Sequence, residues 1–85
     1  MPERSHQTTL TFEYETPALA DTIERSLERE IGEIDDSRSN TTLDRDGSTV
    51  SLTIDAADLV ALRAAANTWL SLASVAERTA ETVDF

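Results

Sequence analysis

Residues 50–76, with the sequence VSLTIDAADLVALRAAANTWLSLASVA, decide the fold of this chain. Residues 50–54 alternate between apolar and hydroxyl side chains, which predicts a strand with one buried face. From residue 56 onward the apolar residues recur every three or four positions, which predicts a helix that continues to about residue 76. Asp55 lies at the junction, where its side chain is predicted to cap the first turn of the helix. A strand therefore leads directly into a long helix at the end of the domain.

The residues before this stretch predict a strand, a helix and a hairpin. Residues 9–15 alternate in the same way and predict a first strand. Thr16-Pro17 is typical of a helix start, and the apolar stripe that follows continues until Gly32, near the predicted helix end. Residues 38–54 contain Asp46-Gly47 between two strand-like runs, which is typical of a tight hairpin turn.

The predicted order of elements is therefore βαββα, and the fold class is α+β. If the first strand pairs antiparallel with the apolar third strand, the result is a three-stranded antiparallel sheet with the order 1-3-2. Both helices then cover one face, and the opposite, Thr-rich face is solvated or available for contact. We expect a flexible N-terminal tail at residues 1–7, a single domain at residues 8–76 and a partly helical extension at residues 77–85.

Composition and charge exclude several classes of protein. The chain has 85 residues, and its seven Arg, no Lys and 17 carboxylates give a formal net charge of −10. Such a surface repels phosphate backbones, which disfavours nucleic-acid binding by this chain alone. Without Cys, and without a run of apolar residues that we expect to span a membrane, the chain is predicted to be soluble and cytoplasmic. The acidic, Lys-free composition also favours a halophilic source, in which salt screens the repulsion between carboxylates.

The sequence lacks the residue patterns of common catalytic sites. It has two Gly and no Lys, which excludes a phosphate-binding P-loop, and its one His, His6, is expected in the N-terminal tail. Residues 44–47 have Gly at the wrong position for a calcium loop and are predicted to form the hairpin turn. Asp35 and Asp36 are predicted to be solvated in a polar loop. We therefore expect no enzymatic activity, no cofactor and no metal ion.

The last helix has more apolar surface than one small sheet can bury. The stripe that we assign to the sheet consists of Leu59, Leu62, Ala66, Trp69, Ala73 and Ala76. A second stripe is offset by about 100° around the helix and consists of Ala61, Ala65, Thr68, Leu72 and Val75. Because no residue from 64 to 76 is charged, we expect another chain to cover this second stripe. The alternative is that an Ala-rich helix leaves mildly apolar surface in solvent.

Residues 52–70 resemble the signature of the small, Pcc-family subunit of the KEOPS complex, in a haloarchaeal-like composition. In that family an apolar strand leads into Ala-x-Asp, Leu-Arg-Ala, an Asn and an aromatic-Leu pair. The corresponding residues here are Ala56-Ala57-Asp58, Leu62-Arg63-Ala64, Asn67 and Trp69-Leu70. Arg38-Ser39 at the start of the preceding strand also agrees with the family, whereas Ala65 departs from it, because relatives often have Ser there.

The resemblance implies a non-catalytic dimerisation and scaffold subunit of a complex that makes threonylcarbamoyladenosine in tRNA. Its implied partners are a second copy of the chain and, through the helices, the catalytic ASKHA-fold subunit, with a kinase-like subunit bound indirectly. Contact with tRNA is expected only through the assembled complex or weakly, at Arg38 or Arg4. The alternative function is a small KH-like RNA-binding module that acts alone, although the Gly-x-x-Gly loop of such modules is absent.

Seven residues of the last helix are predicted to bind the partner: Ala61, Arg63, Ala65, Asn67, Thr68, Leu72 and Val75. For Arg63 and Asn67, the resemblance implies that they orient the helices of the partner. A local role is equally compatible with the pattern, with Arg63 paired to Glu24 or Glu28 and Asn67 bonded to backbone near a helix crossing.

Overall fold

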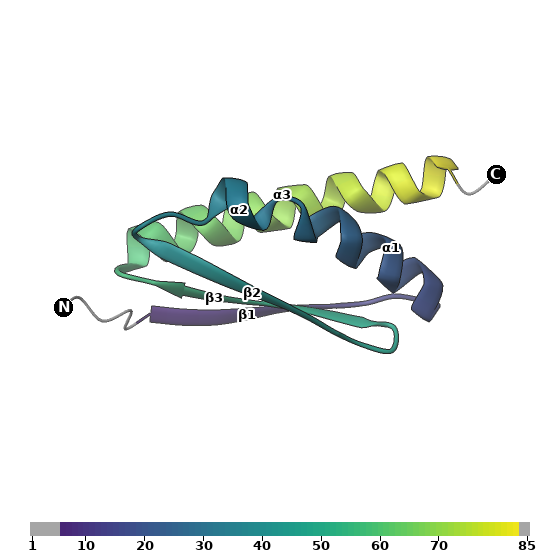
Figure 1. Cartoon of the computed structure of the whole chain (residues 1–85), viewed down its shortest axis with the longest axis horizontal. Coiled ribbons are helices and arrows are strands. Elements are labelled where there is room, and N and C mark those ends of the chain that lie inside the picture. The colour runs from purple at the N-terminus through teal and green to yellow at the C-terminus, as the bar shows by residue number, and fades with distance from the viewer. Residues whose placement is uncertain (1–5, 84–85) are drawn as a thin grey trace.

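The structure, a computed structural model that describes residues 6–83, contains three strands and three helices. In chain order they are β1 (His6–Glu13), α1 (Pro17–Glu28), α2 (Ile31–Ile34), β2 (Ser39–Asp46), β3 (Thr49–Ala56) and α3 (Leu59–Val83). The strands form an antiparallel sheet in the order β1-β3-β2, and the helices lie on one face of it (Figure 1). The predicted α+β class and the 1-3-2 order are confirmed, with α2 as an additional single turn.

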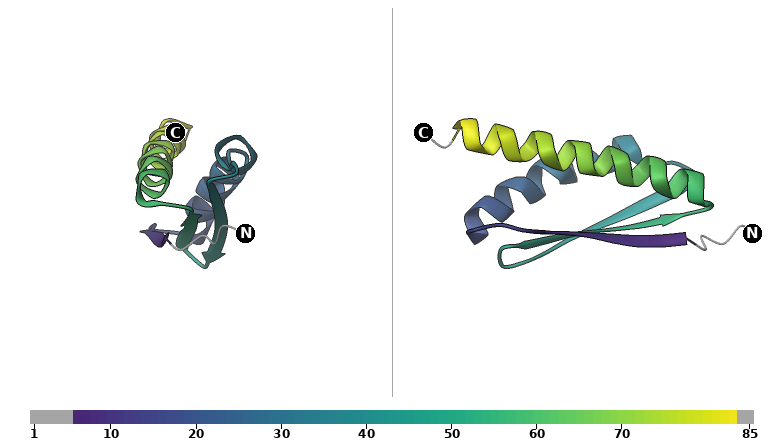
Figure 2. Two further views of the ribbon diagram at one scale, coloured as in Figure 1. Left: turned by 90° about the vertical axis from the view of Figure 1, so that its left-hand side faces the viewer. Right: turned by 180° about the vertical axis from the view of Figure 1, so that it is seen from behind.

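The two long helices divide the covered face of the sheet between them. Viewed end on, α3 lies above β1 and α1 lies above β2, with β3 in the middle (Figure 2). Residues of β3 alternate between buried and partly exposed along the whole strand, as the sequence pattern predicted. The central strand therefore provides the floor against which both helices pack.

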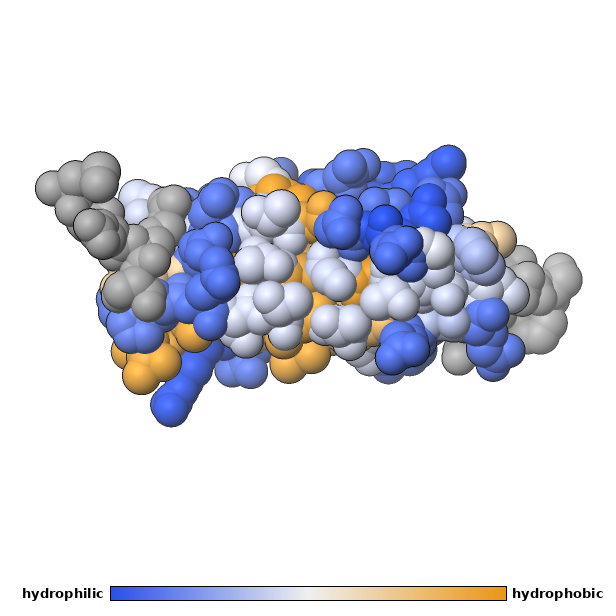
Figure 3. Space-filling model, turned by 90° about the horizontal axis from the view of Figure 1, so that it is seen from below, coloured by the Kyte–Doolittle hydropathy of each residue, from blue (hydrophilic) through white to orange (hydrophobic). Residues whose placement is uncertain are grey.

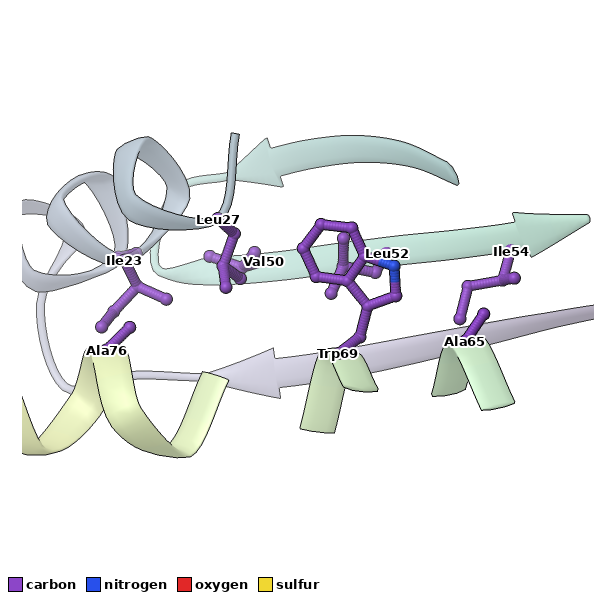
Figure 4. Packing of buried hydrophobic residues seen from close by; sticks show 9 residues of the cluster. Ile23, Leu27, Val50, Leu52, Ile54, Ala65, Trp69 and Ala76 are labelled. Atoms are coloured by element: carbon purple, nitrogen blue, oxygen red, sulfur yellow. The ribbon is translucent and has the colours of Figure 1, made fainter. Parts of the chain in front are cut away.

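Trp69 of α3 is the largest fully buried side chain. It lies over Leu52 of β3, and its indole N–H donates to Thr41 Oγ1 at 3.1 Å (Figure 4). On either side of Trp69, Ala65 faces Ile54 and Ala76 lies beside Ile23 of α1 (Figure 4). The small residues allow α3 to approach β3 and α1 closely, while the indole fills the space between the helices and the sheet.

The start of α1 agrees with the prediction, and its end does not. Thr16 Oγ1 accepts a hydrogen bond from the Leu19 N–H at 3.1 Å, and Pro17 is the first helical residue. The helix ends before Gly32, because the Glu30 N–H bonds to the Leu27 carbonyl, three residues back, at 3.0 Å. This tighter turn interrupts the α-helical hydrogen bonding, and α2 follows as a separate turn.

The cap of α3 also differs from the prediction. Asp55 is not the cap but a residue of β3, which continues to Ala56 because both neighbouring strands pair with it there. Asp58 caps the helix instead, and its Oδ1 accepts the Ala61 N–H at 2.8 Å. His6, expected in a tail, is the first residue of β1 and pairs opposite Ala56.

A two-residue loop, Gly47 and Ser48, joins β2 and β3. Gly47 has a φ of 63°, while Asp46 is the last residue of β2 and pairs opposite Thr49. A positive φ at the first loop residue is the geometry of a type II′ hairpin, and Gly adopts it without steric cost. The predicted turn is therefore confirmed, one residue later than the Asp46-Gly47 pair indicated.

Candidate partner-binding surface

α3 has one side against the sheet and α1, and another side that no described residue covers. Its buried residues recur every three or four positions and are Ala61, Ala65, Trp69, Ala73 and Ala76. Leu62, Ala66, Leu72 and Ala80 pack partly buried beside them. The exposed residues from 60 to 75 form what we call the outer face of α3: Val60, Arg63, Ala64, Asn67, Thr68, Leu70, Ser71, Ser74 and Val75.

Large exposed hydrophobic side chains are concentrated on α3. Among the residues whose side chains the structure describes, Val60 is 71% exposed, Val75 and Leu59 are both 51% exposed, and Leu70 is 47% exposed. A single exposed Leu or Val is ordinary in any domain. Four such side chains on one helix, in a chain with a net charge of −10, form an exposed apolar surface of the kind that protein contacts use.

The outer face contains one charge, on Arg63, and no carboxylate occurs from residue 59 to residue 76. Within residues 6–83, the Arg63 side chain makes no hydrogen bond or ion pair. By contrast, each of Arg25, Arg38 and Arg45 lies within 3.1 Å of a carboxylate oxygen. The local pairing considered for Arg63 with Glu24 does not occur, since the Arg45 Nε–H donates to Glu24 at 2.9 Å. Arg63 therefore differs from these three arginines in its lack of a counter-ion.

The structure divides the seven predicted partner-binding residues. Arg63, Asn67, Thr68 and Val75 belong to the outer face, and Leu72 is half-buried at its border, packed against the core. Ala61 and Ala65 are only 8% and 5% exposed, which corrects the prediction that they lie on an exposed stripe. Conversely, Leu59, assigned to the sheet, is half exposed. Ala and Leu occur all around α3, so the sequence pattern is compatible with more than one helical phase.

Five outer-face residues were absent from the sequence prediction, namely Val60, Ala64, Leu70, Ser71 and Ser74. At 100° per residue, a helical projection centred on Trp69 places Val60, Ala64, Ser71 and Ser74 on the opposite side of the helix and Leu70 about 100° away. The signal that would have found them is therefore the position of the one Trp, which has to be buried, rather than the spacing of the Ala and Leu residues.

A groove of about 240 Å³ lies beside the outer face, where the first turns of α3 pass α2 and the start of β2. It is lined by Ile34, Asp36, Arg38, Ser39, Ala61, Ala64, Ala65 and Thr68. Three of the four lining residues from α3 are Ala, whose single methyl groups leave the space open. Ala64 and Thr68 belong both to the groove and to the outer face, so the two surfaces are continuous.

Arg38, one of the lining residues, forms an ion pair with Asp58 at 2.6 Å. The Ala61 N–H, and after it the Arg38 guanidinium, lower the pKa of the Asp58 carboxyl. Because the folded state favours the charged form, the resulting stabilisation is present above the usual Asp pKa of about 4 and is lost as the pH falls below it. Arg38 is thus engaged within the domain, and Arg4, the other arginine considered for tRNA, lies outside the described residues.

The connection between α2 and β2 is held by the two Asp side chains predicted to be solvated. Asp36 Oδ1 accepts the backbone N–H groups of residues 38 and 39 at 2.8 and 3.1 Å. Asp35 Oδ2 accepts the Thr41 N–H at 2.9 Å, and its buried Oδ1 has no hydrogen-bond partner among the described residues. The prediction is therefore wrong for Asp35, which is linked through Thr41 to the buried Trp69.

The uncovered face of the sheet presents hydroxyl groups in register. Thr9, Thr53 and Thr42 lie opposite one another across the three strands, and the hydroxyls of Thr9 and Thr53 are 3.2 Å apart. Weakly polar residues occupy the middle of this face, with hydrophilic residues toward its ends (Figure 3). Phe12 and Tyr14 pack against the core instead, so the described part of this face has no aromatic side chain for base stacking.

The described residues contain no arrangement typical of catalysis or metal binding. Within residues 6–83, no group of three or more His, Cys, Asp or Glu could hold a metal ion. The Tyr14 hydroxyl donates to Glu77 at 2.7 Å, and burial, followed by this hydrogen bond, raises the pKa of Tyr14. Since Tyr14 follows β1 directly and Glu77 lies on α3, this contact attaches the second half of α3 to the sheet.

Contrary to the sequence prediction, residues 59–80 of α3 are long and apolar enough to cross a membrane by length and composition alone. The core helix of a globular domain can have the same length and apolar composition. Here Trp69 and its small neighbours are buried against the sheet and α1, and in total 28% of an 18-residue apolar segment of this stretch is buried within the domain.

Comparison with known proteins identifies a family for the chain. The family described as "Transcription factor Pcc1" matches residues 7–81. No curated protein matches the chain. The matched residues include nearly all of the sheet, α1, α2 and the complete outer face of α3.

Proposed function

Since this chain belongs to the Pcc1 family of small KEOPS subunits, we propose that it is the non-catalytic scaffold subunit of a KEOPS complex. In this role it supports threonylcarbamoyladenosine modification of tRNA by binding the catalytic ASKHA-fold subunit through its helices, with the contact on the outer face of α3. The kinase-like subunit is bound indirectly, and tRNA is contacted mainly through the assembled complex.

The outer face of α3 is the observation that supports this proposal. Val60, Leu70 and Val75 are each about half exposed or more, with small or uncharged residues between them. Exposed apolar side chains at helical spacing are the pattern by which one helix packs against another. The adjoining groove adds space into which a side chain of the partner fits.

We place homodimerisation on the sheet, so that α3 stays available for the catalytic subunit. β1 and β2 are both edge strands, and the Thr-rich face has hydroxyls in register between them. Either an edge or this face provides a contact between two copies. Measurement of the molecular mass of the purified chain, with and without the catalytic subunit, tests this part of the proposal.

Binding to the catalytic subunit is tested with a pair of matched variants. Val75→Asp adds a carboxylate to the outer face of α3, and Thr22→Asp adds one to an exposed position of α1. We expect Val75→Asp to weaken binding by about tenfold or more, as for loss of an apolar anchor, and Thr22→Asp to bind normally. Both variants are expected to unfold at the same denaturant concentration as the wild type. Equal binding by both would refute the role of α3.

The RNA-binding alternative is tested by filter binding with the isolated chain. The net charge of −10 and the absence of aromatic side chains from the described sheet face both oppose it. Tight, salt-sensitive RNA binding by the chain alone would replace the scaffold proposal.

A cytoplasmic location follows from the proposed role in tRNA modification, and salt adaptation is proposed from the acidic, Lys-free composition. The unfolding midpoint is expected to rise as KCl is increased, because the cations screen repulsion among the carboxylates. Full, cooperative folding in salt-free buffer would contradict the salt adaptation without affecting the scaffold role.

A further inference from the structure

We propose that the partner covering the outer face of α3 supplies a carboxylate to Arg63, and that this partner is a different protein rather than a second copy of this chain. The inference rests on the proposed function and adds the chemistry of the surface that α3 recognises: an apolar helix side with an Asp or Glu opposite Arg63.

Arg63 is an unpaired cation in a strongly acidic chain. The chain has 17 carboxylates for seven Arg, and yet the Arg63 guanidinium bonds to none within residues 6–83. Arg29 of the α1 end is also exposed and unpaired, but Glu28 and Glu30 flank it in the sequence. Arg63 has no such neighbours, because the nearest acidic residues along α3 are Asp58 and Glu77.

Any molecule that covers the apolar residues of the outer face also covers Arg63. Val60 precedes Arg63 by three residues and Leu70 follows it by seven, so all three lie on one side of the helix. A guanidinium that loses its hydration without gaining a counter-ion opposes association strongly. The partner therefore has to bring a negative charge to this position, where a carboxylate accepts two parallel hydrogen bonds from the guanidinium.

A second copy of the chain does not meet this requirement. A twofold contact places the same patch on both sides of the interface, and the outer face contains Arg63 and no carboxylate. The acidic residues that adjoin it in the sequence or line its groove are already engaged: Asp58 with Arg38 at 2.6 Å, Glu77 with the Tyr14 hydroxyl at 2.7 Å, and Asp36 with the backbone N–H groups of residues 38 and 39. Self-association through this face would thus bury two unpaired guanidinium groups.

The test compares substitutions of Arg63 and Arg29, each made in the full-length protein and titrated with the purified catalytic subunit at low and at high KCl. We expect Arg63→Met to bind about tenfold or more weakly, as for loss of one member of a close interfacial charge pair, and Arg63→Glu to bind more weakly still. Arg29→Met, the matched control, is expected to bind within about twofold of the wild type, as for a charge at the rim or outside the interface. The difference between wild type and Arg63→Met is expected to shrink at high KCl.

Rescue identifies the counter-charge directly. With Arg63→Glu as the background, an Asp→Arg or Glu→Arg change at the correct position of the catalytic subunit is expected to restore binding. Thermal melts of each variant alone verify that an exposed substitution leaves the fold intact.

The outcomes separate this inference from the proposed function. If the wild type binds the catalytic subunit and Arg63→Met binds equally well at low KCl, the carboxylate inference is wrong while the scaffold role is retained. If the wild type does not bind the catalytic subunit at all, the scaffold proposal fails and this inference fails with it. If Arg63→Glu abolishes self-association of the chain, the outer face is the homodimer contact and the commitment to a different protein is overturned.

Discussion

α1 and α3 pack on the same face of the same sheet, but they differ in what they present to solvent. On α1, Asp21 binds both Arg25 and Arg45, and Glu24 binds Arg45, so three of its four charged side chains are paired within the domain, and Glu28 is the exception. On α3, the outer face has exposed Val and Leu side chains and one arginine without a counter-ion. The charges of α1 are thus mostly balanced within the domain, whereas the outer face of α3 is the surface that we propose another chain covers.

The difference does not arise from the core, because both helices depend on it equally. Ile23 and Leu27 of α1 and Trp69 of α3 are fully buried in one cluster with the central strand. The comparison therefore concerns the outer halves of the two helices. Four substitutions test the difference between the two helices. The first removes the indole of Trp69 from the buried cluster that both helices share.

Trp69→Ala is expected to have the largest effect. Loss of the buried indole and of its hydrogen bond to Thr41 should lower the free energy of unfolding by about 3–5 kcal/mol, a large fraction of the stability of a small domain. Urea denaturation measures the change. The neighbouring outer-face substitution Leu70→Ala is the control and is expected to change stability by less than about 0.5 kcal/mol. Similar losses for the two variants would show that the boundary between core and outer face is misplaced.

Ala65→Leu tests that boundary on α3 itself. Ala65 faces Ile54 in the core, so the additional atoms should cost about 1–3 kcal/mol through overpacking. Ala64→Leu, one residue earlier and exposed, should change stability by less than about 0.5 kcal/mol. Chemical denaturation of both variants distinguishes them. If Ala65→Leu were neutral, the sequence-based assignment of Ala65 to a partner surface would be restored.

Tyr14→Phe tests the contact by which α3 binds the end of β1. Removal of the hydrogen bond to Glu77 should lower stability by about 1 kcal/mol at neutral pH. Since the folded state raises the pKa of Tyr14, the wild type should lose this stabilisation as the pH rises above the unfolded value of about 10. A pH series of unfolding midpoints should show a smaller alkaline loss for Tyr14→Phe. Identical alkaline slopes would contradict the contact.

Arg45→Met is expected to have the smallest effect. It removes the cation that binds Asp21 and Glu24 on α1 while keeping most of the apolar length of the side chain. The thermal midpoint should fall slightly at low salt, and the difference should disappear as salt screens the remaining carboxylates. A loss that persisted at high salt would mean that Arg45 stabilises the domain through packing rather than charge.

Most of the fold follows from local patterns that need no knowledge of distant contacts. The alternation of β3, the turn at Gly47 and the Thr16-Pro17 start of α1 are read directly from neighbouring residues. The predictions for Asp55 and Asp35 are wrong because contacts with another part of the chain determine where these two side chains lie. Asp55 belongs to β3 rather than to a cap because β1 and β2 both pair with that strand end, and Asp35 is partly buried because it bonds to the Thr41 N–H.

The candidate surface was located on the correct helix, but its residues were only partly identified. The absence of charge from residue 64 to residue 76 is visible in the sequence and indicates that α3 has an unusual face. The sequence does not show which face of α3 packs against the sheet, because Ala fits both a buried core and a contact with a partner protein. Trp69 was assigned to the sheet in either case, and the tertiary structure decides the rest by burying Ala61 and Ala65 beside it and leaving Val60 and Ala64 exposed.

The sequence by itself determined the order of the strands and the two long helices and the surplus of apolar residues on the last helix, because these depend on periodicity and on the conformational preferences of individual residues. Only the tertiary structure decided that Ala61 and Ala65 are buried and that Val60, Leu70 and Arg63 are exposed. The physical reason is that burial is a property of what lies opposite a side chain, and the sheet opposite α3 comes from residues distant in the sequence.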